Sequence, residues 1–150
     1  MERFVSEPIR IAEPEHGERT FARADIVLYG VDHSGESYEG RVFFENPGAD
    51  IETPRDAGQG YAGSFYVFGH GGCYGEEGHC DPARRTTDEF DLRLPHPLEP
   101  FTKTVIVTKA LQAVAAEAVV VTVVPVASAP DGPRLSDALH FTHLRLLTYE

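Results

Sequence analysis

The chain has 150 residues, of which 41% are hydrophobic and 25% are charged, and its formal net charge at pH 7 is −11. A domain of this length buries roughly 68–70% of the surface that its unfolded chain exposes, so we expect one hydrophobic core. The acidic excess would repel a phosphate backbone, so we expect no nucleic-acid partner. It favours solubility and cationic partners, metal ions included.

No targeting or membrane segment is expected. The N-terminal residues contain neither a long apolar run nor a small-residue cleavage site, so no secretion signal is seen. The most apolar stretch, residues 110–126, is interrupted by Gln112, Glu117 and Pro125 and is shorter than the roughly 20 residues that span a bilayer. We expect a cytoplasmic protein, or one exported only with a partner.

The first half of the chain predicts an arm followed by strands. Residues 1–20 alternate charge with Pro and Gly, which indicates an extended N-terminal arm with a short edge strand at residues 9–12. Residues 21–150 are expected to form a single domain. Residues 21–31 and 38–44 have the apolar alternation of strands around a turn cluster and predict a hairpin. A long surface loop is expected at residues 45–63, and a central strand at residues 64–68, which are apolar on both faces.

The second half predicts further strands and one helix. Residues 87–94 alternate polar and apolar side chains, which is typical of a half-buried strand. A β-branched strand at residues 104–108 is followed by a short helix at residues 109–116, which Thr108 would cap. Strands are also expected at residues 119–126 and 140–149.

These patterns predict an all-β fold, an antiparallel β-sandwich of about seven or eight strands with one short helix. The 14 Gly and 11 Pro residues agree with it, because they indicate many turns.

The densest chemical cluster follows the predicted central strand. Two thiols and two imidazoles, from His70, Cys73, His79 and Cys80, fall within a short Gly-rich loop and would suit Cu(I) or Zn. The Cys-x6-Cys spacing is not that of a standard zinc finger. The two cysteines therefore remain open to three interpretations, namely metal ligands, a disulfide or reduced thiols.

Other motifs give weaker evidence of a functional site. The string Gly58-Gln-Gly60-Tyr-Ala-Gly63 matches G-x-G-x-x-G, but a dinucleotide site needs a strand before it and a helix after it, and here a strand follows. The turn His70-Gly-Gly has no G-x-S-x-G nucleophile elbow to accompany it. The remaining histidines, among them His33, His140 and His143, are interpreted as surface or satisfied core residues.

Three segments together resemble a known family. They are Tyr61-Ala-Gly-Ser-Phe-Tyr-Val-Phe-Gly69, Phe21-Ala-Arg-Ala-Asp-Ile-Val-Leu-Tyr-Gly-Val-Asp-His-Ser34 and Asp88-Glu-Phe-Asp-Leu92. Their order and composition resemble the C-terminal β-sandwich domain of type-3 copper proteins, the molluscan hemocyanins and some tyrosinases. The resemblance covers about residues 21–126.

The resemblance implies a non-catalytic role. In that family histidines of a separate helical domain hold the copper and the sandwich covers the site, so the implied partner is a type-3 copper oxidase domain or subunit. Phe68 and Tyr74 are the candidates for the side chain that enters the copper pocket. The loop with His70, Cys73, His79 and Cys80 departs from the family pattern, which adds the hypothesis that it assists copper loading. The alternative is a self-contained ligand- or protein-binding module in which this loop is structural.

Overall fold

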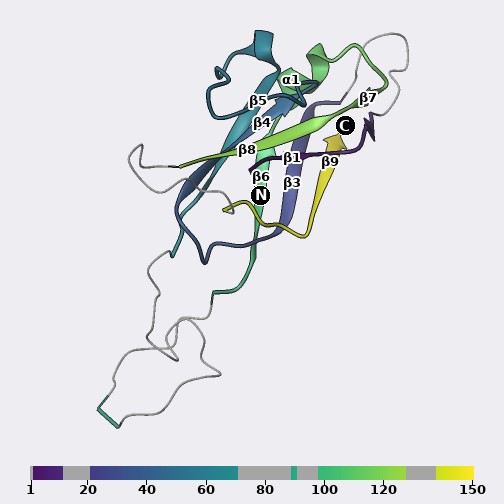
Figure 1. The fold of residues 1–150 in the computed structure, drawn as a ribbon. Helices are drawn as coiled ribbons and strands as arrows, with labels where there is room; N and C mark the ends of the chain where they lie inside the picture. Colours follow the sequence, from purple (N-terminus) through teal and green to yellow (C-terminus); the bar gives the residue numbers. More distant parts are fainter. Residues whose placement is uncertain (1, 12–20, 71–88, 91–97, 128–137) are drawn as a thin grey trace.

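The structure, a computed structural model, describes residues 2–11, 21–70, 89–90, 98–127 and 138–150 (Figure 1). These residues form antiparallel strands, one α-helix and one 3-10 helix, which confirms the predicted all-β class. The elements are β1 Phe4–Val5, β2 Ile9–Arg10, β3 Arg23–Val31, β4 Tyr38–Phe44, η2 Ala57–Gln59, β5 Tyr61–Val67, β6 Phe101–Ile106, α1 Thr108–Ala113, β7 Ala118–Val119, β8 Val121–Ala127 and β9 His143–Tyr149.

The strands form two larger sheets and one small one. The first sheet has the order β1-β8-β4-β5, the second has the order β6-β3-β9, and β2 pairs with β7. Alternate side chains of the two larger sheets share one core: Val42 and Phe44 of β4 and Ile26 and Leu28 of β3 belong to the same buried cluster. In Figure 1 β8 and β4 cross the long axis of β3, as the layers of a sandwich do.

The predicted hairpin of residues 21–31 and 38–44 is wrong. β3 pairs with β6 and β9, while β4 pairs with β5 and β8, so the two strands lie in different sheets. Residues 32–37 pass from one sheet to the other, and the Asp32 N–H donates to the His140 carbonyl, 3.0 Å away. Alternation specifies which face of a strand is buried but not which strand is its neighbour.

The strand predicted at residues 64–68 differs in position and length. β5 begins at Tyr61, inside the predicted loop, and forms an edge of its sheet within the described residues instead of a central strand. Phe65 and Val67 point into the core, whereas Tyr66 between them is exposed. The aromatic side chain of Tyr66 made an edge strand look apolar on both faces.

The N-terminal residues add two short strands. β1 pairs with β8 and β2 pairs with β7, in the region of the predicted edge strand at residues 9–12. Ser6 is joined to Val121 by two hydrogen bonds, one from each backbone N–H, and Ile11 is buried in the core. Residues 4–11 therefore contribute to the same core as the sandwich, while the boundary at residue 20 stays a prediction.

The helix forms in the expected region, but it ends at Ala113 instead of residue 116 and is not capped by Thr108. Val107 occupies the N-cap position, and Thr108 is the first residue of α1. The Thr108 hydroxyl oxygen instead accepts from the backbone N–H of Ala24, 3.0 Å away, and so joins α1 to β3. Leu111 is the buried anchor of the helix.

Two further expectations are corrected in part. Of the strand predicted at residues 87–94, Glu89 and Phe90 lie in a turn and the other residues lie outside the described part of the chain. The last strand begins at His143 instead of His140. Among the described residues, no helix is long and apolar enough to cross a membrane.

Candidate functional site

The end of the sandwich from which the Cys/His loop departs is built by strand ends. β5 ends at Val67, which pairs with Tyr38 at the start of β4. The Gly69 N–H then donates to the Ser37 hydroxyl, 3.0 Å away, and the His70 N–H donates to the His33 carbonyl, 2.8 Å away. These bonds hold the chain against the connection between β3 and β4 as far as His70.

Two histidines meet at this end. The rings of His33 and His70 lie edge to face with centroids 5.0 Å apart. The His33 Nε2 donates to the Glu99 carbonyl, 2.8 Å away, because a carbonyl can only accept, and the same ring lies 4.5 Å from that of Phe101. No local sequence pattern indicates this contact, because His33 and His70 are brought together only by the pairing of β4 with β5.

The predicted covering side chains are Phe68 and Tyr74. Phe68 follows the last residue of β5, and 84% of its surface is exposed, more than any other described large hydrophobic residue. Covering an exposed aromatic ring in this position with a partner surface is favourable, because apolar surface is removed from water. Tyr74 lies outside the described residues.

Of the predicted metal ligands, only His70 lies in the described part of the chain. Cys73, His79 and Cys80 lie outside it, so the metal site formed by these four residues stays a prediction. Among the residues that are described, no group of three or more His, Cys, Asp or Glu side chains could hold a metal ion.

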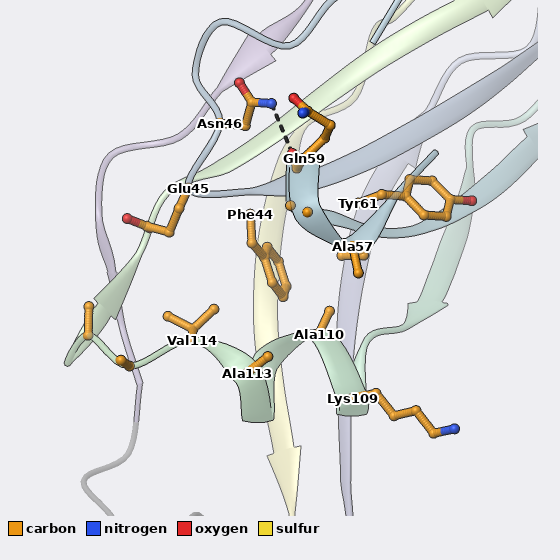
Figure 2. Close-up of a pocket in the computed structure, with 15 residues that line it drawn as sticks. Phe44, Glu45, Asn46, Ala57, Gln59, Tyr61, Lys109, Ala110, Ala113 and Val114 are labelled. Atoms are coloured by element: carbon orange, nitrogen blue, oxygen red, sulfur yellow. Dashed lines mark hydrogen bonds between the residues drawn. The ribbon is translucent and has the colours of Figure 1, made fainter. Parts of the chain in front are cut away.

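A groove that the sequence analysis did not anticipate lies at the opposite end of β4 (Figure 2). Its volume is about 840 Å³, and its lining combines the end of β4, residues 57–62 and α1 with the residues after it. Figure 2 shows Phe44 and Ala57 facing the helix side chains Ala110 and Ala113, and Val114 directly after the helix, across it. The sequence signal was the run of small residues in both walls.

The wall of the groove depends on an unusual backbone. Gly60 has φ +79°, and a Cβ there would lie 2.1 Å from the Phe44 carbonyl oxygen. Glu45 has φ +53°, and its carboxylate accepts from the Val120 N–H, 2.6 Å away. The string Gly58-Gln-Gly60-Tyr-Ala-Gly63 thus forms the end of η2 and the start of β5, so a strand and not a helix follows it, as the sequence predicted.

A polar network attaches the loop after β4 to the outer surface of the first sheet. Glu39 accepts from Arg41 Nε at 3.0 Å, Arg55 Nη1 at 3.1 Å and the Ser64 hydroxyl at 2.6 Å. Burial raises the pKa of Glu39, but the hydrogen bonds from Ser64 and Arg41 and the charges of both arginines outweigh it and hold this pKa below its usual range. The carboxylate of Glu39 stabilises the loop only while it is charged.

Comparison with known proteins gives a match in fold. No family model matches the sequence, and no curated protein matches it. Solved structures of a latent aurone synthase (polyphenol oxidase) do match: the enzyme from its natural source gives a TM-score of 0.57 at 16% identity over 99% of this chain. The recombinantly expressed latent enzyme gives 0.55 at 16% identity over 99% of this chain.

The chain spans 24% of the length of these two polyphenol oxidase structures. At this identity the match shows the fold alone. It confirms, in fold, the resemblance to the C-terminal β-sandwich of type-3 copper proteins that residues 21–34 and 61–69 carry in the sequence.

Proposed function

We propose that this chain is a non-catalytic accessory domain or subunit of a tyrosinase-like type-3 copper oxidase, where it packs on the copper domain and shields the copper site. One observation carries the proposal: the fold accounts for nearly all of this chain but only 24% of each matched polyphenol oxidase. The greater part of such an oxidase is therefore available to hold the copper, while a domain of this fold is an addition to it.

Phe68 supports the shielding role. It stands at the end of β5 with 84% of its surface exposed, on a backbone held by the bonds of Gly69 and His70 described above. Because the neighbouring backbone is already held, only the two side-chain torsions of the phenylalanine are ordered when its ring enters a pocket. We assign to Phe68 the contact with the partner's copper pocket.

The test uses phenol oxidation by a type-3 copper oxidase domain from the same genome, measured with and without this chain. The chain should bind the domain and lower its phenol turnover, and Phe68→Ala should restore most of that turnover. Phe90→Ala is the matched control, because Phe90 is 81% exposed in a turn and the same atoms are removed. Absence of binding, or phenol turnover by this chain alone with added copper, would refute the accessory role.

Copper loading is a separate part of the proposal. His70, Cys73, His79 and Cys80 offer thiolate and imidazole groups, which suit Cu(I) in transit. Titration of the purified chain with Cu(I) should show binding that Cys73→Ser/Cys80→Ser abolishes. Binding that is absent or unchanged in this variant, or a disulfide that thiol labelling shows never to open, would contradict a role in copper transfer.

The groove beside α1 favours the alternative function, a self-contained binding module. Its volume of about 840 Å³ is within the range of small-molecule sites, and its lining combines small apolar residues with a few polar ones, among them Glu45, Asn46 and Lys109. Native mass spectrometry of the purified chain would detect a retained small molecule, and Ala113→Trp should displace it by filling the groove. If the purified chain retained no ligand but bound the oxidase domain, the accessory role would be the better account.

A further inference from the structure

The surface of the second sheet that faces away from the core has the features of a protein interface. We call it the outer sheet face; it consists of alternate residues of β3 from Arg23 to Tyr29, of β6 from Thr102 to Ile106, and of β9 from His143 to Tyr149. Leu144 and Leu146 of β9, which alternate with them, pack against the core instead. The outer sheet face is therefore defined by the register of the three strands.

Its composition differs from that of the chain as a whole. Asp and Glu number 24 in the chain, but Asp25 is the only acidic residue of the outer sheet face. Asp25 is buried beneath Arg23, whose Nε lies 2.8 Å from its carboxylate. Arg145 has no ion pair with an acidic side chain of the described residues, so it leaves the surface locally cationic on an acidic molecule.

The side chains of the outer sheet face are pre-ordered. The rings of Tyr29 and His143 stack with centroids 4.5 Å apart, and the Arg23 guanidinium lies 5.9 Å from the centroid of the Tyr149 ring. Ile106 is 61% exposed at the rim. Tyr and Arg are the residues that contribute most to binding at protein interfaces, and acidic residues are depleted there.

The size of the outer sheet face indicates which kind of partner it fits. Three strands of about seven residues cover roughly 14 Å by 24 Å, or about 340 Å², at ordinary strand spacings. A stable complex of separate proteins buries about 800 Å² on each partner, so a face this small does not by itself support a dimer of free chains. Contacts between domains of one chain are often smaller, because the linker keeps the partners close.

We infer that the outer sheet face is the surface that docks on the copper domain of the oxidase, with a carboxylate of that domain opposite Arg145 and apolar side chains opposite Ile106 and Tyr149. This inference rests on the proposed function and adds the docking surface to it. A second copy of this chain would place Arg145 against a surface that is itself cationic, so the charges favour an acidic partner surface.

The outer sheet face and Phe68 can contact the same partner. The stacked pair Tyr29 and His143 lies where β3 ends and β9 begins. β6 begins at the same end with Phe101, whose ring contacts His33, and His33 in turn contacts His70, two residues after Phe68. The outer sheet face thus leads to the end of the sandwich that carries Phe68.

The experiment measures the Kd of this chain for a type-3 copper oxidase domain from the same genome. Ile106→Glu and Arg145→Glu should each raise the Kd about tenfold or more, because each places a carboxylate on the docking surface. Ile51→Glu and Arg10→Glu are matched controls: Ile51 is also 61% exposed, Arg10 is an exposed cation on β2, and neither belongs to the three strands of the outer sheet face. The controls should bind like the wild type, and circular dichroism should show that all four variants fold.

The outcomes separate this inference from the proposed function. Binding by the wild type that Phe68→Ala weakens but Ile106→Glu and Arg145→Glu leave unchanged would overturn the docking surface and retain the accessory role. No binding by the wild type would overturn both. A dimer of this chain in sedimentation that Ile106→Glu dissociates would overturn the inference, because the outer sheet face would then be a contact between copies.

Discussion

The charge of the Glu39 carboxylate contributes to the stability of the fold, because three side chains donate hydrogen bonds to it. The carboxylate accepts hydrogen bonds from Arg41, Arg55 and Ser64, which hold its pKa in the folded chain below its usual range. A carboxyl with a lowered folded pKa contributes stability that is present above its unfolded pKa and is lost as the pH falls through the folded pKa.

Glu39→Gln should therefore destabilise the chain at neutral pH and matter less in acid. The difference in free energy of unfolding between wild type and variant should shrink as the pH falls from about 7 to about 3, because Glu39 becomes protonated in the wild type. Urea denaturation at a series of pH values measures this difference. A difference that is constant with pH would show that the charge of Glu39 is not what stabilises the loop.

Gly60 is required by backbone geometry at the wall of the groove. Its φ of +79° disfavours a side chain, and a Cβ would lie 2.1 Å from the Phe44 carbonyl oxygen, which is backbone and cannot rotate away. Gly60→Ala should cost about 1–3 kcal/mol of unfolding free energy. Gly35→Ala is the control, because a Cβ at Gly35 has no neighbour within 4 Å. Equal stabilities for the two variants would contradict the close approach.

At the scale of elements, the sequence predicted which segments are strands better than how they pair. β4 lies at residues 38–44, where alternation predicted it, because alternate residues of an antiparallel strand face the core and the solvent. The pairing of β3 with β6 and β9 was missed, since the paired residues lie between 70 and 126 positions apart in the sequence and leave no local pattern.

The short N-terminal strands should contribute to the stability of the fold through Ile11. Ile11 is buried in the core next to the small β2-β7 sheet, whereas Val5 of β1 points partly to solvent. Ile11→Ala should cost about 2–5 kcal/mol of unfolding free energy, and Val5→Ala less than about 1 kcal/mol. Denaturant unfolding compares the two. If both changes were nearly neutral, residues 4–11 would not be part of the cooperative fold.

At the scale of the molecule, the sequence located part of the candidate site. The resemblance named Phe68 as a candidate covering residue, which stays a prediction, and the structure shows that its side chain is exposed. The contact of His33 with His70 and the groove beside α1 were not predicted. Both depend on segments that meet only after the sheets have formed, so no spacing along the chain could indicate them.

The small area of the outer sheet face leads to a prediction about tethering. If about 340 Å² is the main docking surface, the free chain should bind the oxidase domain weakly. A chain joined to that domain by a flexible linker has an effective concentration of about 1 mM, which compensates for weak contacts.

Phenol oxidation should therefore be inhibited almost completely in a fusion of the two domains and only slightly by the free chain at about 1 μM, a thousandfold below the effective concentration of the tethered form. Cleavage of the linker with a site-specific protease, followed by dilution, should restore turnover at a rate set by dissociation. Ile51→Glu in the fusion should leave inhibition intact, whereas Ile106→Glu should reduce it even before cleavage, because tethering cannot replace the contact that the carboxylate disrupts. Full inhibition by nanomolar free chain would show that the interface is larger than the outer sheet face.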